Sequence, residues 1–248
     1  MASVIEFSKL SYQHPGAAAP VIQGLSLNIE AGSFVAVVGG SGVGKSTLLR
    51  AAAGLAEPAS GEVRFQPPAR PRRRSRAVVF QDSRLMPWRT VGGNVGYGLE
   101  GLGLDRAERQ RRVDAALQLT GLADYGRRWP HQLSGGQAQR VGIARALAVK
   151  PDLLLMDEPF SAVDAITRRN LQQELIRVWQ ASGAAVLFVT HDIEEAVFLA
   201  DKVVVLGGRP ANIAGNYAID LPRPRDRADP AFCLLYTSDA ADDTPCVD

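Results

Sequence analysis

Nine consecutive residues near the start of the chain have the types and spacing that hold a triphosphate. Residues 39–47 read Gly-Gly-Ser-Gly-Val-Gly-Lys-Ser-Thr, between an apolar run at 33–38 and a helical run at 48–55. Glycines let the backbone curl so that several N–H groups point at one phosphate chain, and the following helix adds its positive end. The segment predicts a chain that binds and splits a nucleoside triphosphate.

The side chains of this loop have separate expected roles. Lys45 is expected to hold the β- and γ-phosphates, and the Ser46 hydroxyl is expected to bind Mg²⁺. A glycine-rich turn without a ligand is the alternative, and the strand and helix around the loop favour the ligand. The predicted binding residues are Gly39, Gly40, Ser41, Gly42, Val43, Gly44, Lys45, Ser46 and Thr47.

Two adjacent carboxylates end a second apolar run. Residues 153–157 are typical of a buried parallel strand, and Asp157 and Glu158 stand at its carboxyl end. A buried strand that ends in two acids is costly without a cation. Asp157 is therefore a predicted Mg²⁺ ligand, and Glu158 is the predicted general base that polarises the attacking water. A strand that simply runs into an acidic turn is the alternative.

Two further polar residues follow predicted strands. Gln81 comes after the strand expected at 77–80, and His191 comes after the one expected at 185–190. Both are expected to face the same site. An isolated histidine is more often a structural hydrogen bonder, but its position after a second core strand favours a catalytic role here.

A second anion-binding segment is predicted at residues 133–140, which read Leu-Ser-Gly-Gly-Gln-Ala-Gln-Arg. A serine and two glycines at a helix start can bind phosphate, and a plain helix cap is the alternative. One triphosphate loop with two phosphate grips makes sense if two copies face each other head to tail. ATP would then lie between the Lys45 loop of one copy and this segment of the other. Its predicted contacts are Ser134, Gly135, Gly136 and Gln137.

The patterning also predicts the elements that position these groups. Strands are expected at 4–10, 24–30, 33–38, 61–65 and 77–80. Helical signals begin at residue 91, where Asp105 and Glu108 form a capping box for a helix to Thr120, and Ser134 caps another to Val149. A helix at 165–180 separates the strands at 153–157 and 185–190. These elements predict an α/β core with a β-rich first third and a helical insert.

Composition limits the class of protein. With 248 residues and 46% hydrophobic composition, the chain is expected to form one globular unit. It has neither an apolar run of about 18 residues nor a signal-peptide pattern, so we expect it in the cytoplasm. A formal charge of +2 is too small to indicate nucleic acid as a partner. The basic run at 67–76 is predicted to be a solvated loop rather than a binding patch.

The end of the chain is treated separately. Residues 233–242 resemble the translation of a transposon-end adapter used in sequencing libraries, so we exclude 233–248 as a non-native tail and expect a native terminal segment to be missing. Both cysteines, Cys233 and Cys246, lie there, which leaves none for a disulfide or a metal site in the rest of the chain. The expected domain is 1–232, with a helical subdomain at about 88–150.

Together and in this order, these motifs resemble those of the ATP-binding cassette ATPases of ABC transporters. Resemblance extends from about Val4 to Asp226 and includes Ser161-Ala-Val-Asp164. It implies an α/β phosphate-loop NTPase core with an antiparallel β subdomain and a helical insert, and it implies ATP and Mg²⁺ as ligands. The implied roles are adenine stacking by Tyr12, sensing of Mg²⁺ and the permease by Gln81, dimer contact by Asp164, and γ-phosphate contact by His191.

Residues 81–91, Asn94, Val95 and the segment 220–225 further resemble the importer cassettes for nitrate, aliphatic sulfonates and taurine. This implies a subunit at the cytoplasmic face of the membrane, bound to permease subunits and through them to a substrate-binding protein. Residues 85–88 (Leu-Met-Pro-Trp) would then form part of the apolar surface that receives a permease helix. The alternative places Leu85 and Trp88 in the core of the helical insert. Val163 departs from the leucine that is usual in the family.

Two other classes of protein were weighed. A soluble ABC ATPase that acts on nucleic acid or the ribosome usually has two fused cassettes, a long coiled coil or a strongly basic face, and the sequence shows none of these. A phosphate-loop kinase or GTPase has no use for residues 133–140. The cargo is selected by proteins other than this chain, so the sequence predicts only a small anion such as a sulfonate, taurine or nitrate.

Overall fold

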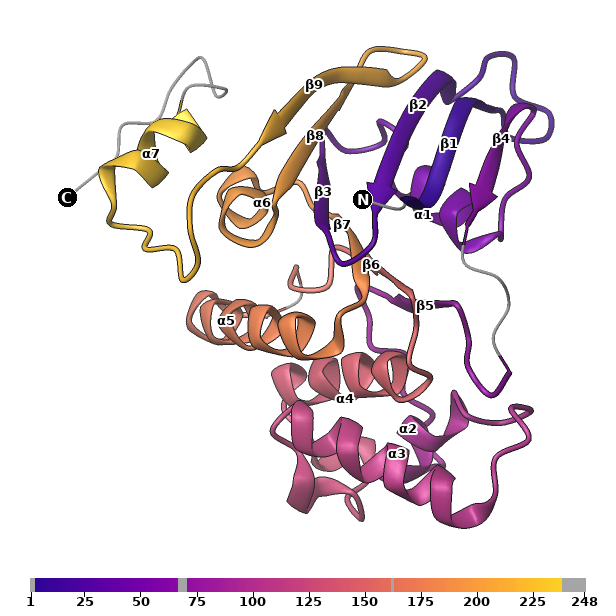
Figure 1. Ribbon diagram of the computed structural model, residues 1–248, viewed down its shortest axis with the longest axis vertical. Coiled ribbons are helices and arrows are strands. Elements are labelled where there is room, and N and C mark those ends of the chain that lie inside the picture. The colour runs from indigo at the N-terminus through magenta and orange to yellow at the C-terminus, as the bar shows by residue number, and fades with distance from the viewer. Residues whose placement is uncertain (1–2, 67–70, 162, 238–248) are drawn as a thin grey trace.

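The computed structural model describes residues 3–66, 71–161 and 163–237, and its strands form two sheets (Figure 1). The larger sheet has the order β5-β6-β7-β3-β8-β9, in which β9 alone runs antiparallel to its neighbour. Its strands are β3 (Phe34–Val38), β5 (Arg76–Val79), β6 (Leu153–Asp157), β7 (Ala185–Val189), β8 (Lys202–Gly207) and β9 (Asn212–Ala218).

The smaller sheet is antiparallel, with the order β2-β1-β4. It comprises β1 (Ser3–Tyr12), β2 (Ile22–Glu30) and β4 (Ser60–Phe65). Along β2, buried and exposed residues alternate over most of the strand, as expected for a sheet with one solvated face. Its buried face shares a core with α1 (Lys45–Ala53) and one face of the larger sheet, including Leu10, Leu25, Ile29 and Leu48. The antiparallel β subdomain predicted from the family resemblance is therefore present.

The helices after β5 form two groups, one in the helical insert and one against the larger sheet. The insert contains α2 (Val91–Tyr97), α3 (Arg106–Leu119), the short helices η1 (Ala123–Tyr125) and η2 (Pro130–Gln132), and α4 (Gly135–Ala148). It has its own core, which includes Val91, Val95, Val113, Leu117 and Val141. Helices α5 (Ala165–Ser182), α6 (Ile193–Leu199) and α7 (Pro230–Thr237) belong to the side of the larger sheet opposite α1. Among the described residues, no helix is long and apolar enough to cross a membrane.

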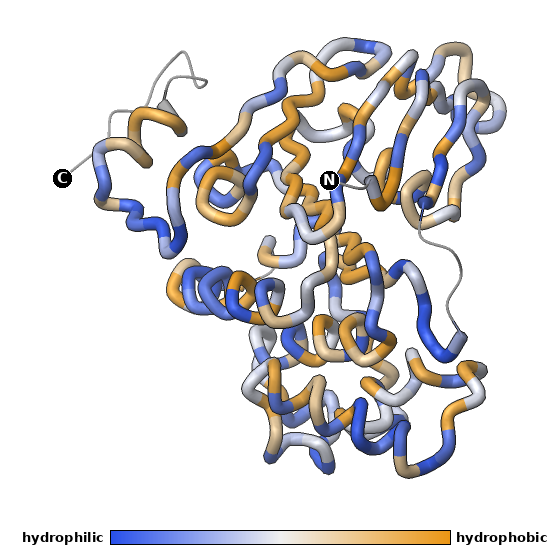
Figure 2. Tube along the Cα trace, in the orientation of Figure 1, coloured by the Kyte–Doolittle hydropathy of each residue, from blue (hydrophilic) through white to orange (hydrophobic). Residues whose placement is uncertain are grey.

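The predicted elements are present, with shifts at their ends. Strands β3, β6 and β7 are buried over almost their whole length and form the continuous apolar centre of Figure 2. Helix α1 begins three residues earlier than predicted, at Lys45, because the phosphate loop leads directly into it. Asp105 caps α3 as predicted, but the capping box is half wrong: the Glu108 carboxylate pairs with Arg111 and Arg112. Helix α6 and strands β8 and β9 were not predicted.

The described part of the basic run, residues 71–76, is more than a solvated loop, and residues 67–70 lie outside the described ranges. Its guanidinium groups donate to carbonyls at helix ends: Arg76 to Ala52 at the end of α1, Arg74 to Gly98 after α2, and Arg73 to Lys150 after α4. Cations interact favourably with the negative end of a helix. These arginines therefore connect the core to the helical insert.

Candidate functional site

Four neighbouring parallel strands bring the predicted site residues to one edge of the larger sheet. Gln81 follows β5, Asp157 ends β6, His191 follows β7, and Gly39 follows β3. Because these strands are adjacent in the order β5-β6-β7-β3, residues distant in sequence lie side by side. Ligands bind at the carboxyl ends of strands in open α/β sheets. The edge is thus the site at which the sequence-based predictions converge.

The phosphate loop is shaped by glycines that no other residue replaces without strain. A Cβ on Gly39 would lie 2.7 Å from the Leu206 carbonyl oxygen, and one on Gly44, at φ 112°, would lie 3.1 Å from Val21 and 3.2 Å from Ile22. Gly44 caps α1, and among the described residues no side chain caps that helix start. The backbone N–H groups at this end are therefore available to an anion.

Lys45 points its ammonium group back along the loop. The side chain is buried, and Nζ donates to the carbonyls of Gly39 at 2.7 Å and Gly40 at 3.1 Å. Nζ also lies 3.8 Å from Glu158 Oε1. The predicted phosphate-binding cation and the predicted general base therefore share one corner of the site.

The predicted Mg²⁺ ligands are in contact. Ser46 Oγ donates to Asp157 Oδ1 over 3.1 Å. Burial raises the pKa of the Asp157 carboxyl group, against the lowering effect of the Ser46 hydrogen bond, and neighbouring Glu158 raises it further. A cation at this position would offset that cost, and hydroxyl and carboxylate oxygens are ligands that Mg²⁺ prefers. Gln81 lines the same hollow as Ser46 and Asp157, so the residues fit the ion.

Glu158 is held in a strained backbone conformation beside His191. Its φ is 42°, its N–H donates to the Val189 carbonyl at 2.9 Å, and its carbonyl accepts from Ser161 Oγ at 3.0 Å. Glu158 Oε2 lies 3.0 Å from His191 Nδ1. A non-glycine residue with positive φ costs free energy and is characteristic of functional sites. The structure thus pairs two residues that were predicted separately.

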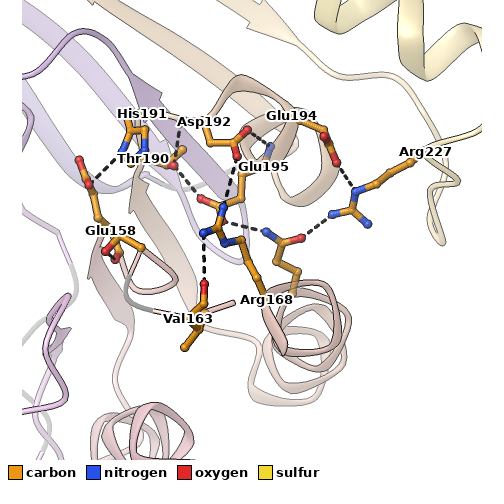
Figure 3. Close-up of polar contacts among 11 residues, drawn as sticks. Glu158, Val163, Arg168, Thr190, His191, Asp192, Glu194, Glu195 and Arg227 are labelled. Carbon is orange, nitrogen blue, oxygen red and sulfur yellow. Dashed lines mark hydrogen bonds and ion pairs between the residues drawn. The ribbon is translucent and has the colours of Figure 1, made fainter. Parts of the chain in front are cut away.

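Sequence reasoning missed a buried polar network behind His191 (Figure 3). Glu195 Oε2 accepts a hydrogen bond from Thr190 Oγ1 at 2.6 Å, and Oε1 accepts one from Gln172 Nε2 at 2.8 Å. Burial raises the pKa of the Glu195 carboxyl group, against the lowering effect of these hydrogen bonds. The only sequence signal was the spacing of Asp192 and Glu195, which fits a helix start: Asp192 Oδ1 accepts from Glu195 N at 3.1 Å.

The second predicted grip lies at the start of α4. Ser134 Oγ accepts from Gln137 N at 3.3 Å, and Gln137 Oε1 accepts from Ser134 N at 3.0 Å, which completes a capping box. Gly135 is exposed, whereas a Cβ on Gly136 would lie 2.7 Å from the Thr167 methyl group of α5. No hydrogen bond between described residues joins Ser134 to the Lys45 loop, although Gly135 lines the same hollow as Ser46 and Asp157.

Asp164 forms the start of α5, next to the α4 start. Its carboxylate accepts from Thr167 N at 3.0 Å, and the Thr167 hydrogen bonds lower the pKa of the Asp164 carboxyl group. Asp164 is exposed. Ala162, in the same predicted dimer-contact loop, lies outside the described residues. The arrangement leaves Asp164 accessible, and its contact with a second copy remains a prediction.

Tyr12 and the segment 85–88 occupy the margins of the site. Tyr12 is half-buried against the core of the antiparallel sheet, and its ring meets that of His14 edge-on at 5.1 Å. It pairs with Ile22, which would lie 3.2 Å from a Cβ on Gly44. Leu85 packs against the core of the helical insert, whereas the Trp88 side chain is 72% exposed. Leu85 therefore belongs to the core of the helical insert and Trp88 does not, and a permease contact of this segment stays a prediction.

The fold and this edge define an α/β phosphate-loop ATPase. Residues 22–161 match the model of the ABC transporter family, and the chain belongs to that family. It is 45% identical over 222 residues to the taurine import ATP-binding protein TauB of Pseudomonas savastanoi pv. phaseolicola, covering 89% of this chain and 85% of that protein. It is 50% identical over 212 residues to the aliphatic sulfonates import ATP-binding protein SsuB of Mycobacterium sp. (strain MCS), covering 86% and 83%.

Solved structures agree with the fold. The cbiO1 protein from Clostridium perfringens, part of the ABC transporter complex cbiONQ, is 28% identical with a TM-score of 0.79, covering 88% of this chain and 90% of that one. The ATP-binding cassette MJ0796, in a dimeric post-hydrolysis state with ADP and Pi, is 29% identical with a TM-score of 0.74, covering 88% and 100%. The predicted fold class and family are confirmed, and the chain is an ATP-hydrolysing cassette.

Proposed function

We propose that this chain is the ATP-hydrolysing subunit of an importer for a small sulfonate such as taurine. The observation that carries the proposal is the convergence of Lys45, the Ser46–Asp157 pair and the Glu158–His191 pair on one sheet edge. The names of the relatives, which import taurine and aliphatic sulfonates, support this cargo class over nitrate.

The proposed reaction divides the work among these residues. Lys45 and the open start of α1 bind the phosphates, and Tyr12 stacks on adenine. Ser46, Asp157 and Gln81 would hold Mg²⁺, which would neutralise negative charge on the phosphates when bound. Glu158 orients and deprotonates the attacking water, and His191 turns toward the γ-phosphate. Most of the rate enhancement arises from this positioning and charge neutralisation.

The complete site requires a second copy. In the proposed dimer, each ATP lies between the loop of one copy and the α4 start of the other. Asp164, beside the α4 start, contacts the partner copy. The dimeric MJ0796 structure with ADP and Pi supports the formation of a dimer. ATP binding closes the dimer, and hydrolysis with product release reopens it.

The helical insert receives the permease at the cytoplasmic face of the membrane. A hollow between α2 and α3 is lined by Gly92, Gly93 and Gly96 together with polar and charged side chains that include Arg106, Arg109 and Asp114. Small side chains allow a helix to approach closely, and exposed Trp88 lies just before α2 in the chain. A substrate-binding protein acts on the far side through the permease. A soluble ATPase that acts on nucleic acid or the ribosome is the second candidate, and no observation favours it.

The experiment is steady-state ATP hydrolysis by Glu158→Gln protein beside direct ATP binding. Loss of the general base lowers kcat by about 100-fold or more while ATP binding is retained. Glu57→Gln, an exposed carboxylate in the loop between α1 and β4, is the control and leaves kcat unchanged. Near-normal kcat in Glu158→Gln would overturn the assignment.

A further inference from the structure

We propose that a hydrogen-bond chain with a buried centre, Arg227–Gln172–Glu195–Thr190, positions His191 for ATP hydrolysis. Through this chain the segment after β9, residues 219–232, sets the turnover rate without touching the nucleotide. The inference rests on the proposed role of His191 at the γ-phosphate. The four residues are positioning residues, and they come from three separate parts of the sequence (Figure 3).

The centre of the chain is a carboxylate with both oxygens engaged. Glu195, Gln172 and Thr190 are all buried, with exposed fractions of 6%, 3% and 2%. Glu195 accepts from Gln172 at 2.8 Å and from Thr190 at 2.6 Å. Burial of a carboxylate costs free energy unless it is hydrogen-bonded, so the Gln172 and Thr190 side chains are held in the orientations that donate to Glu195. Such a network fixes its members more tightly than apolar packing does.

This network connects directly to the backbone on both sides of His191. Thr190 N donates to the Val37 carbonyl of β3 at 3.2 Å, which ties the residue before His191 to the sheet. Thr190 Oγ1 also accepts from Asp192 N at 3.0 Å, which ties down the residue after it. The His191 side chain itself is 62% exposed and meets Glu158 at 3.0 Å. Its position is therefore determined mainly by the anchored residues on either side.

The far end of the network lies in the segment after β9. Arg227 donates to Gln172 Oε1, pairs with Glu194 and stacks on the Phe198 ring at 3.6 Å. Arg225 donates to the carbonyls of Val197, Phe198 and Ala200 at the other end of α6. Both ends of the helix that follows His191 are thus held by arginines from one segment, which links that segment to the catalytic edge.

The test must separate positioning from simple stabilisation. We would measure kcat, KM for ATP and melting temperature for Glu195→Ala, Glu195→Gln, Gln172→Ala and Arg227→Ala in the full chain. Imidazole NMR signals report on the ring directly, because the chain has only 3 histidines and His191→Gln identifies the relevant one. Thr120→Ala is the matched control, since Thr120 is equally buried and donates to Ala116 in the helical insert.

Glu195→Ala and Gln172→Ala are expected to lower kcat on the order of 10-fold with KM nearly unchanged, because small misplacement of a reacting group is costly. Both variants are also expected to shift the His191 imidazole signal. Glu195→Gln is expected to keep kcat and the His191 signal close to those of the unchanged chain, because an amide has the same shape as a carboxylate and can still accept from Gln172. Arg227→Ala is expected to lower kcat less than Gln172→Ala does. The double variant is expected to have the same kcat as Gln172→Ala alone. Thr120→Ala lowers only the melting temperature.

One outcome would overturn the positioning inference, and another would overturn the proposed role of His191. If Glu195→Ala and Gln172→Ala lower the melting temperature as Thr120→Ala does but leave kcat and the His191 signal unchanged, the network is structural and the inference fails. If His191→Gln itself leaves kcat unchanged, the proposed role of His191 fails first, whatever the network does.

Discussion

The starts of α1 and α4 are the two predicted phosphate grips, and they differ in one respect. No side chain among the described residues caps α1, whose first N–H groups follow Gly44. Ser134 and Gln137 close the start of α4 with a reciprocal capping box. The open end needs an outside anion to satisfy its N–H groups, whereas the closed end is satisfied by the chain itself. We infer that α1 supplies most of the ATP affinity and that α4 completes the site only in a dimer.

The largest expected effect is at the open end. Lys45→Ala removes a buried ammonium group that would pair with phosphates, so ATP affinity falls by about 100-fold or more, given roughly 1.5–3 kcal/mol for each charged hydrogen bond. Titration calorimetry with a slowly hydrolysed ATP analogue measures it, with Lys202→Ala, on β8, as the control. An affinity within a few-fold of the unchanged chain would show that the α1 end does not dominate binding.

A helix end closed by the chain should matter for stability and not for ATP affinity. Arg225 is buried and fills the end of α6 with hydrogen bonds, and burial lowers the pKa of its guanidinium to about 10, so it remains charged at neutral pH. Arg225→Met leaves several carbonyls unsatisfied and lowers the free energy of unfolding by about 3 kcal/mol. Urea denaturation measures the loss, while ATP affinity is expected to stay within about twofold. A large affinity loss in folded protein would contradict the distinction between closed and open ends.

The closed start of α4 gives a smaller stability effect. Ser134→Ala removes one half of the capping box and lowers the free energy of unfolding by about 1 kcal/mol. ATP affinity of the single copy is expected to be unchanged, because no hydrogen bond joins Ser134 to the Lys45 loop. Denaturation and calorimetry on the same sample provide both values. A loss of monomer ATP affinity comparable to that of Lys45→Ala would remove the contrast between the two ends.

The smallest expected effect is a pH dependence of stability that arises from Glu195, in the first turn of α6, which the Asp192 side chain caps. Burial raises the folded-state pKa of Glu195, so its contribution to stability is fully present below the unfolded-state value near 4.5 and is lost as pH rises through the raised folded-state pKa. Glu195→Gln cannot titrate there. The stability of Glu195→Gln relative to the unchanged chain should therefore increase as pH rises above about 4.5. Thermal melts of both proteins across this pH range test the prediction, and a difference in stability that does not change with pH would contradict it.

Most of the candidate site could be predicted from the sequence because each part has a local signal. Lys45 and Ser46 lie in one glycine-rich loop, and Asp157 and Glu158 end one apolar strand. Gln81 and His191 could be placed because they follow predicted strands. The parallel strand order then brought them together, as the general rule for such sheets requires.

The remainder depends on contacts between distant residues, which leave no local pattern. Gln172 reads as an ordinary polar position in a helix, and only its neighbours Glu195 and Arg227, 23 and 55 residues away, give it a role. The arginines at 71–76 likewise read as a solvated run because the helix ends that they meet belong to other segments. Whether the domain ends at residue 232 remains a prediction, and residues 238–248, with Cys246, lie outside the described ranges.

The central claim is that ATP binds between the open α1 end of one copy and the closed α4 end of another. The most direct measurement is the molar mass of the full chain carrying Glu158→Gln, by light scattering with and without ATP and Mg²⁺. The account predicts a shift from monomer to dimer with ATP and Mg²⁺, and loss of that shift when Ser134→Arg is added. A chain that binds ATP but stays monomeric, or a dimer that forms equally well with Ser134→Arg, would contradict it.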